Sequence, residues 1–138
     1  MNIKAIALAS VVGLSAPAIT AVTLNPQSAS ATPRNATRPT GAFLDKSKNW
    51  VIRLNYDRYG NYIYDSLDRK NYRTLNLKNP AIAGTYRRYT YTFYNGRHKY
   101  IVAHRPNDPQ FIRVTVINPQ GRTIFNRLMK RVGDDWDV

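Results

Sequence analysis

The two histidines are the first residues whose chemistry could serve catalysis, since a basic protein with one histidine as base and another as acid could cleave RNA. His98 and His104 lie six residues apart in a run rich in aromatic and β-branched residues. On one strand this spacing corresponds to roughly 20 Å, too far for both rings to reach one phosphate. Neither histidine is therefore predicted to be catalytic, and a small secreted hydrolase is kept only as an alternative.

Three aspartates, Asp57, Asp65 and Asp68, form the loose acidic group in the body of the chain. Paired carboxylates could hydrolyse a glycosidic bond, but these lie in predicted turns beside arginines, where ion pairs or turn hydrogen bonds explain them. The same segment fails as a calcium loop, because Tyr62 stands where that loop needs glycine. Without cysteines, and with two distant histidines, no zinc site is predicted. The sequence thus predicts no metal, no cofactor and no catalytic residue.

Surface recognition is the chemistry that remains. All ten tyrosines lie between residues 56 and 100, interleaved with Arg and Lys. Aromatic rings beside cations can stack on bases or sugars while the charges hold an anionic backbone. The alternative is that most of these tyrosines form the core and cross-strand pairs. The predicted binding residues are Arg88, Tyr94, Arg97 and Lys99, with Arg58 and Tyr59 as a second candidate patch.

A hairpin from Tyr86 to Arg105 must position most of these residues. Asn95-Gly96 between two β-rich runs predicts a type I′ turn, and this turn pairs Tyr94 with Arg97. Side chains then alternate between an aromatic core face and a basic wet face. The predicted core face holds Tyr89, Tyr91, Phe93, His98, Tyr100, Val102 and His104. The predicted outer face holds Arg88, Thr90, Thr92, Tyr94, Arg97, Lys99 and Ile101.

Alternation predicts further strands at residues 50–56, 62–64, 72–77, 111–118 and 122–128. Residues 81–84 are interpreted as a link. Asn118-Pro119-Gln120-Gly121 predicts a type I turn ending in a glycine bulge, which would place Ile124 and Leu128 inward, against Val116 and Ile112. Six or seven short strands with turn signals roughly every 8–12 residues predict an all-β fold. The expected architecture is an antiparallel meander curled into a small barrel or sandwich.

Four segments are distinguished along the chain. Residues 1–31 have a positive start, an apolar run and small residues before position 31, the layout of a signal peptide. Residues 32–48 are interpreted as a flexible lead-in, and residues 49–133 as a single β domain. Residues 134–138 form an acidic tail, either solvated or folded over the basic face. The mature chain is expected to be secreted or periplasmic, with no transmembrane segment.

The charge is strongly unbalanced, with 21 Lys and Arg against 8 acidic residues and a formal charge of +13. A field of this sign attracts polyanions. Arg outnumbers Lys by 14 to 7, which favours bidentate contacts with phosphate, sulfate or carboxylate. The alternative interpretation is charge for solubility alone.

From Tyr89 the chain continues through the turn at 95–96, Pro106-Asn-Asp-Pro, Val114-Thr-Val and Asn118-Pro-Gln-Gly to Leu128. This layout resembles small exported all-β proteins of unknown function from cyanobacteria and related bacteria. The resemblance covers roughly residues 89–128 and consists of a pattern of strands and turns. It implies a non-enzymatic exported β domain and assigns no functional residue.

These observations predict an exported basic β domain that binds an anionic polymer or surface, such as a polysaccharide, a nucleic acid or lipopolysaccharide. A protein-interaction module or inhibitor in the cell envelope, binding through the hairpin edge or the Asn95-Gly96 tip, is an alternative from another class. The identity of the ligand and the oligomeric state stay open.

Overall fold

The regular structure of residues 38–134, which the computed structural model describes, consists of two antiparallel meanders. The first meander comprises β4 (Gly41–Asp45), β5 (Trp50–Tyr56), β6 (Tyr62–Asp68) and β7 (Arg73–Lys78). The second comprises β8 (Ala81–Thr85), β9 (Arg88–Asn95), β10 (His98–His104), β11 (Phe111–Ile117) and β12 (Thr123–Gly133). The predicted signal peptide and most of the predicted acidic tail lie outside the described residues.

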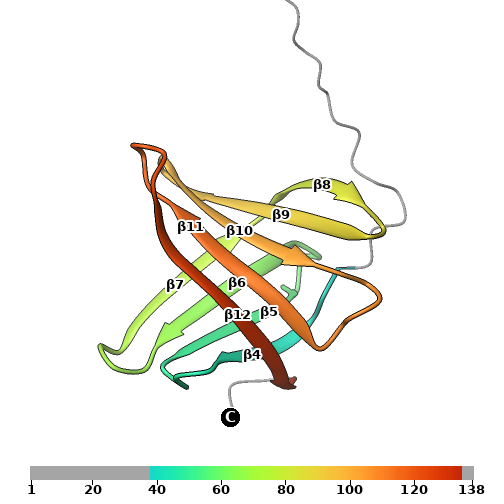
Figure 1. Ribbon diagram of the computed structural model, residues 1–138, viewed down its shortest axis with the longest axis horizontal. Helices are drawn as coiled ribbons and strands as arrows, with labels where there is room; N and C mark the ends of the chain where they lie inside the picture. Colours follow the sequence, from blue (N-terminus) through green and yellow to red (C-terminus); the bar gives the residue numbers. More distant parts are fainter. Residues whose placement is uncertain (1–37, 135–138) are drawn as a thin grey trace, which may run out of the picture. The chain divides into compact units, whose positions relative to one another are not determined.

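Pairing of β4 with β12 joins the meanders into one nine-stranded sheet, in the order β7-β6-β5-β4-β12-β11-β10-β9-β8. The sheet curls into a half-barrel whose edge strands are β7 and β8, and β7 comes into contact with β9 (Figure 1). The prediction of an all-β antiparallel fold is confirmed. The predicted six or seven strands were too few, and the sheet is neither a closed barrel nor a sandwich.

Two strands were not predicted from the sequence, and each omission has a physical reason. Gly41–Asp45, expected to belong to a flexible lead-in, form β4 in the middle of the sheet. Four of its five residues are buried, so the strand lacks the alternation that marks a sheet with one wet face. Ala81–Thr85, interpreted as a link, form β8 along β9. Their small side chains, and a positive φ of 99° at Gly84, weaken the strand signal.

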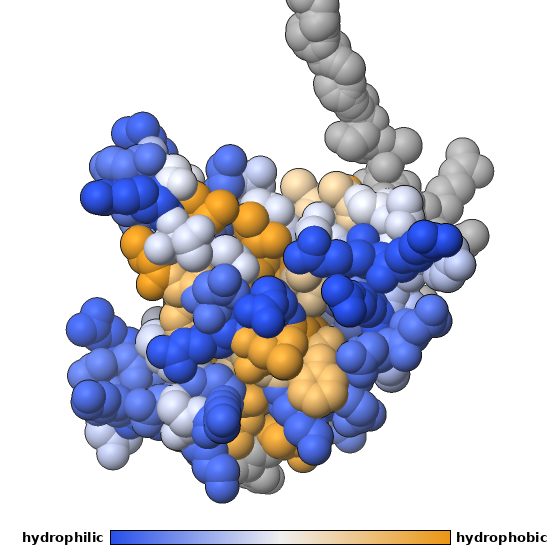
Figure 2. Space-filling view, in the orientation of Figure 1, coloured by the Kyte–Doolittle hydropathy of each residue, from blue (hydrophilic) through white to orange (hydrophobic). Residues whose placement is uncertain are grey.

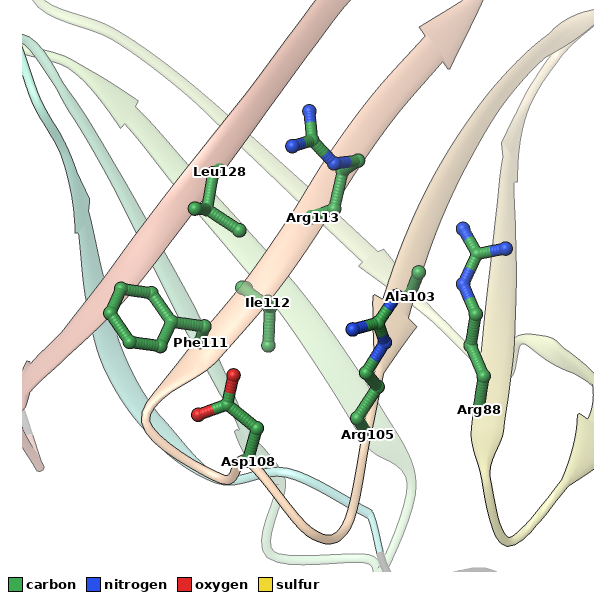
Figure 3. Close-up of a pocket in the computed structure, with 8 residues that line it drawn as sticks. All are labelled: Arg88, Ala103, Arg105, Asp108, Phe111, Ile112, Arg113 and Leu128. Carbon is green, nitrogen blue, oxygen red and sulfur yellow. The ribbon is translucent and has the colours of Figure 1, made fainter.

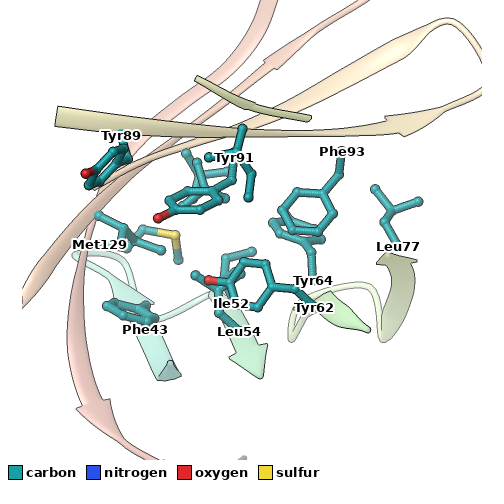
Figure 4. Packing of buried hydrophobic residues seen from close by; sticks show 14 residues of the cluster. Phe43, Ile52, Leu54, Tyr62, Tyr64, Leu77, Tyr89, Tyr91, Phe93 and Met129 are labelled. Carbon is teal, nitrogen blue, oxygen red and sulfur yellow. The ribbon is translucent and has the colours of Figure 1, made fainter. Parts of the chain in front are cut away.

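The core lies on the concave face of the sheet. Tyr89, Tyr91 and Phe93 extend from β9 toward Phe43 and Tyr62 on the first meander (Figure 4). Tyr91 and Phe93 are 0% exposed, and their rings lie 5.6 and 6.0 Å from that of Tyr62. Burial raises the pKa of Tyr91 to about 12 and raises that of Tyr62 further. Tyr89, Tyr91 and Phe93 of the hairpin are therefore core, as their alternation predicts.

The hairpin has a different register from the predicted one. Tyr94 faces Lys99 and Tyr91 faces Val102, a shift of two residues. Gly96 has a φ of 60°, whereas Arg97 is not among the residues with positive φ, which fits a type II′ turn with glycine at its first central position. A shift of two residues leaves every side chain on its predicted face, because the side-chain period of a strand is two.

The register of β11 with β12 is shifted by one residue, and the prediction for this pair is wrong. Ile112 faces Met129, whereas Ile124 and Leu128 point outward and are 57% and 51% exposed. The irregularity lies between Val116 and Ile117, where an extra residue reverses the alternation of the strand that follows. Figure 2 shows apolar side chains interrupting the hydrophilic surface over this part of the sheet.

A matched pair of substitutions distinguishes the two registers. Met129→Ala should lower the free energy of unfolding by about 2–5 kcal/mol, because Met129 is 0% exposed and its loss leaves a cavity. Leu128→Ala, one residue away, should cost about 0.5 kcal/mol or less, because the side chain is half exposed. Urea unfolding of both variants measures the difference. Equal losses, or a larger loss for Leu128→Ala, would contradict the observed register.

Asp45 stabilises the pairing of β4 with β12, which joins the two meanders. Its carboxylate accepts hydrogen bonds from the Ser47 hydroxyl at 2.6 Å and from the backbone N–H groups of Asn49 and Trp50 at 3.0 Å. It also pairs with the Arg127 guanidinium of β12 at 2.9 Å, while its own side chain is 1% exposed. Burial raises the pKa of this carboxyl, but the hydrogen bonds and the charge of Arg127 outweigh it, so the pKa lies below its ordinary value.

Asp45→Asn should therefore lower the free energy of unfolding by about 1–3 kcal/mol near neutral pH. Because the pKa of Asp45 is lower in the folded than in the unfolded protein, its ionised carboxylate stabilises the fold at pH values above the unfolded pKa of about 3.9. This stabilisation is lost as the pH falls through the pKa of the folded state. The difference between wild type and variant should thus shrink below about pH 4. Urea unfolding from pH 7 to pH 3 tests this, with the exposed Asp134→Asn as control. A difference independent of pH would exclude the ionised carboxylate as its source.

Candidate functional site

The two ends of the half-barrel are defined by the turns between strands. The turns at 46–49, 69–72, 96–97 and 118–122 lie at one end, here called the Gly96 end. The turns at 57–61, 86–87 and 105–110 lie at the other, here called the Pro106 end. Because neighbouring strands are antiparallel, residues at the start of one strand share an end with residues that finish the next.

The predicted binding residues do not form one site. Tyr94, Arg97 and Lys99 lie together at the Gly96 end, with Lys99 directly opposite Tyr94. Arg88 lies on the same outer face but at the other end of β9, roughly 20 Å from Tyr94 at six residues of strand rise.

Arg58 and Tyr59 lie in the turn between β5 and β6, on the first meander. There the Arg58 guanidinium lies 4.9 Å from the centre of the Tyr59 ring, and the ring is 73% exposed. The predicted second patch is thus a local contact between two neighbouring side chains. The structure does not bring it to the hairpin residues of the first patch.

Arg88 instead lies beside two arginines that the sequence prediction omitted. Arg105 follows β10 and Arg113 lies on β11, and with Arg88 they line a hollow of about 350 Å³ (Figure 3). Ala103, which pairs with Arg113 across the strands, contributes a small side chain between them. Phe111 and Leu128 supply apolar walls, and Asp108 is the acidic lining residue.

A second hollow continues the first around the turn between β8 and β9. It is lined by Tyr86, Arg87 and Asn107, and it shares Arg88, Arg105 and Asp108 with the first. The two together are called the basic groove. Its members are Tyr86, Arg87, Arg88, Ala103, Arg105, Asn107, Asp108, Phe111, Ile112, Arg113 and Leu128.

The charges of the groove are largely uncompensated. Among residues 38–134, Arg87, Arg88 and Arg105 form no ion pair, and Arg113 donates a 2.8 Å hydrogen bond to the neutral amide of Asn126. Residues 81–133, the second meander, hold ten Lys and Arg against one Asp. Residues 41–78, the first meander, hold eight against four, and there Arg53 pairs with Asp65 at 3.0 Å. The positive field is therefore concentrated on the second meander.

Three acidic residues considered for catalysis have structural partners instead. Asp57 accepts hydrogen bonds from Asn61 and the Tyr59 N–H within its turn, and the Asn61 side chain is the main cause of its lowered pKa. In the next turn, Asp68 accepts hydrogen bonds from the Lys70 N–H and the Asn71 side chain, and its pKa is also lowered. Asp65 pairs with Arg53. Turn hydrogen bonds and ion pairing thus account for all three.

The histidines lie at opposite ends of β10. His104 is 3% exposed, and burial lowers its pKa while Asp108 partly opposes the shift. His98 starts the strand at the Gly96 end. Within the described range, no group of three His, Cys, Asp or Glu side chains lies close enough to hold a metal ion.

Comparison of the chain with protein-family models, curated proteins and solved structures finds no match. Across residues 38–134 there is also no helix of the length and apolarity needed to cross a membrane. The resemblance to exported cyanobacterial proteins therefore stays a prediction.

Two signals in the sequence could have identified the groove. Tyr86-Arg87-Arg88 and Arg105 flank the hairpin at the same end, so the hairpin alone brings them together. Arg113 alternates with the apolar Ile112 and Val114 and so is marked as outward-facing. Its position beside Ala103, however, depends on the register of β10 with β11, which the loop of residues 105–110 does not fix in advance.

Proposed function

We propose that this protein is an exported β domain that binds an anionic polymer in the basic groove. The observation that carries the proposal is the convergence of Arg88, Arg105 and Arg113 on one hollow without acidic partners of their own. Keeping three guanidinium groups close together costs electrostatic repulsion, which an anion would relieve. Arg presents a planar fork of donors that suits phosphate, sulfate and carboxylate groups.

The shape of the groove favours a polymer over a single ion. Two adjoining hollows share Arg88 and Arg105, so successive charged units of one chain can lie along them. Phe111 and Leu128 offer apolar surfaces against which a sugar or base can pack between the charges. Lys99, Arg97 and Tyr94 lie farther along the outer face, within reach of a longer polymer.

The proposed location follows from the signal-peptide layout of residues 1–31. Outside the cytoplasm, the anionic polymers available include polysaccharides, lipopolysaccharide and released nucleic acid. Counterion release from any of these would supply a binding free energy that depends strongly on salt.

The alternatives have less support from the geometry. A protein partner was expected to add to the free edge of the hairpin, but β8 occupies that edge along residues 88–92. The exposed edges of the sheet are instead β7 and β8. Of the groups considered for hydrolysis, His104 is buried, and the three aspartates of the first meander's turns and strands, Asp57, Asp65 and Asp68, serve turn hydrogen bonds and an ion pair.

Replacing the three arginines together tests the proposal. The variant R88Q/R105Q/R113Q should bind fluorescein-labelled heparin at least about tenfold more weakly at low salt, because three contacts to anionic groups are lost. The slope of log K against log salt should become shallower by about 2, since fewer counterions are released. Fluorescence anisotropy between low and moderate salt measures both, and single-stranded polyuridylate serves as a second polymer.

The variant K46Q/K48Q/K70Q is the matched control, because it removes the same charge from exposed turns at the Gly96 end of the first meander. It should retain most of the affinity. An equal loss in both variants would mean that net charge alone attracts the polymer. Binding that does not weaken with salt would exclude the electrostatic mechanism altogether.

A further inference from the structure

The concave face of the half-barrel is not filled along its whole length. At the Gly96 end a cavity of about 420 Å³ opens among aromatic side chains. Trp50 and Phe125 meet edge to face at 5.2 Å on one side, and Tyr64 and Tyr100 lie 5.8 Å apart on the other. These four rings come from β5, β12, β6 and β10, so the cavity lies where a closed barrel would have its core.

The contrast with the rest of the concave face is large. Toward the Pro106 end, Tyr91 and Leu54 are 0% exposed and Tyr89 is 4% exposed. Trp50, Tyr100 and Phe125 continue the same inner face but are only partly buried. Apolar ring surface that stays in contact with water favours an apolar ligand, because burial of that surface is favourable. Phe93 packs against Tyr64 at 5.4 Å, so the packed core lies directly beside this part of the cavity.

One charge is available beside the cavity. Arg73 begins β7 and lines the opening, and none of the lining residues in the described part of the chain is acidic. Its neighbour across the strands, Asp68, has its carboxylate engaged by the Lys70 N–H and by Asn71. The Asn71 side chain is the main cause of the lowered pKa of Asp68, and the charge of Arg73 is a smaller one. Within residues 38–134, Arg73 forms no ion pair. The other polar side-chain groups of the lining are the hydroxyls of Ser66, Thr74 and two tyrosines and the indole N–H of Trp50.

We propose that this cavity binds a small amphipathic carboxylate, with its apolar body among the four rings and its carboxylate at Arg73. A neutral sugar fits the lining less well, because the lining offers neither a carboxylate nor a side-chain amide to accept hydrogen bonds from several sugar hydroxyls. A cation would meet Arg73 and no opposing charge. The site is independent of the basic groove, which lies on the outer face at the opposite end.

Trp50 lines the cavity and reports on its occupancy. The chain has two tryptophans, so the variant Trp136→Phe leaves Trp50 as the sole indole. Titration of this full-length variant with decanoate, below its micelle concentration, should change the Trp50 emission saturably. Decanol should bind more weakly, and decyltrimethylammonium more weakly still. Arg73→Gln in the same background should weaken decanoate binding about tenfold and leave decanol unchanged, because one charge-assisted contact is lost.

Two controls keep this result separate from the groove and from the fold. R88Q/R105Q/R113Q in the Trp136→Phe background should bind decanoate as before, even if it no longer binds heparin. Urea unfolding of the Arg73→Gln variant should match its background, because Arg73 is exposed. The absence of saturable decanoate binding would overturn the proposal, as would equal affinity for decanoate in Arg73→Gln. Binding of a neutral sugar in preference to decanoate would likewise contradict it.

Discussion

Pairing of the first described strand with the last is the constraint on which this fold depends. Without it, β4–β7 and β8–β12 would be two separate sheets, each with its own exposed edges and an uncovered apolar face. Asp45 secures that pairing from inside, since one carboxylate fixes the turn that follows β4 and holds Arg127, 82 residues away in sequence. Once joined, the sheet can curl so that β9 covers the first meander. The core, the groove and the open cavity all follow from that curl.

The same alternation that builds the core also separates the two candidate sites. Side chains of one parity on β9 and β10 enter the core, so those of the other parity, including Arg88 and Lys99, must face outward. The first meander holds half as many acids as cations; Asp57 and Asp65 pair with cations there, and Asp45 pairs with Arg127 of the second meander. The second meander has one acid, Asp108, and that acid lies in the groove itself. The outer face therefore suits a charged polymer, and the concave face suits an apolar body.

Local patterns predicted which side chains face inward, but not which strands are neighbours. The aromatic face of β9 and β10 was predicted correctly even with the wrong turn. A register error of two residues keeps every side chain on the same face, because side chains on a strand alternate with a period of two. At the irregularity between Val116 and Ile117, by contrast, the predicted register was wrong by one residue. Leu128 was therefore predicted to face inward, whereas Met129 does so. β4 was missed because burial on both faces removes alternation, and its pairing with a strand more than 80 residues away leaves no local trace. The groove needed Arg113 beside Ala103, a register that long-range packing fixes.

The two ends of the concave face differ because their side chains differ in volume. Toward the Pro106 end, large rings such as Phe43, Tyr62 and Tyr91 fill the space between the meanders. Toward the Gly96 end, Ser66 and Val116 occupy equivalent inward positions on β6 and β11 and leave room that the neighbouring rings do not close. Larger residues there would bury Trp50 and Phe125 and stabilise the sheet. A fold that leaves this space open is less stable than one with better packing there, and such a loss of stability is expected at a binding site.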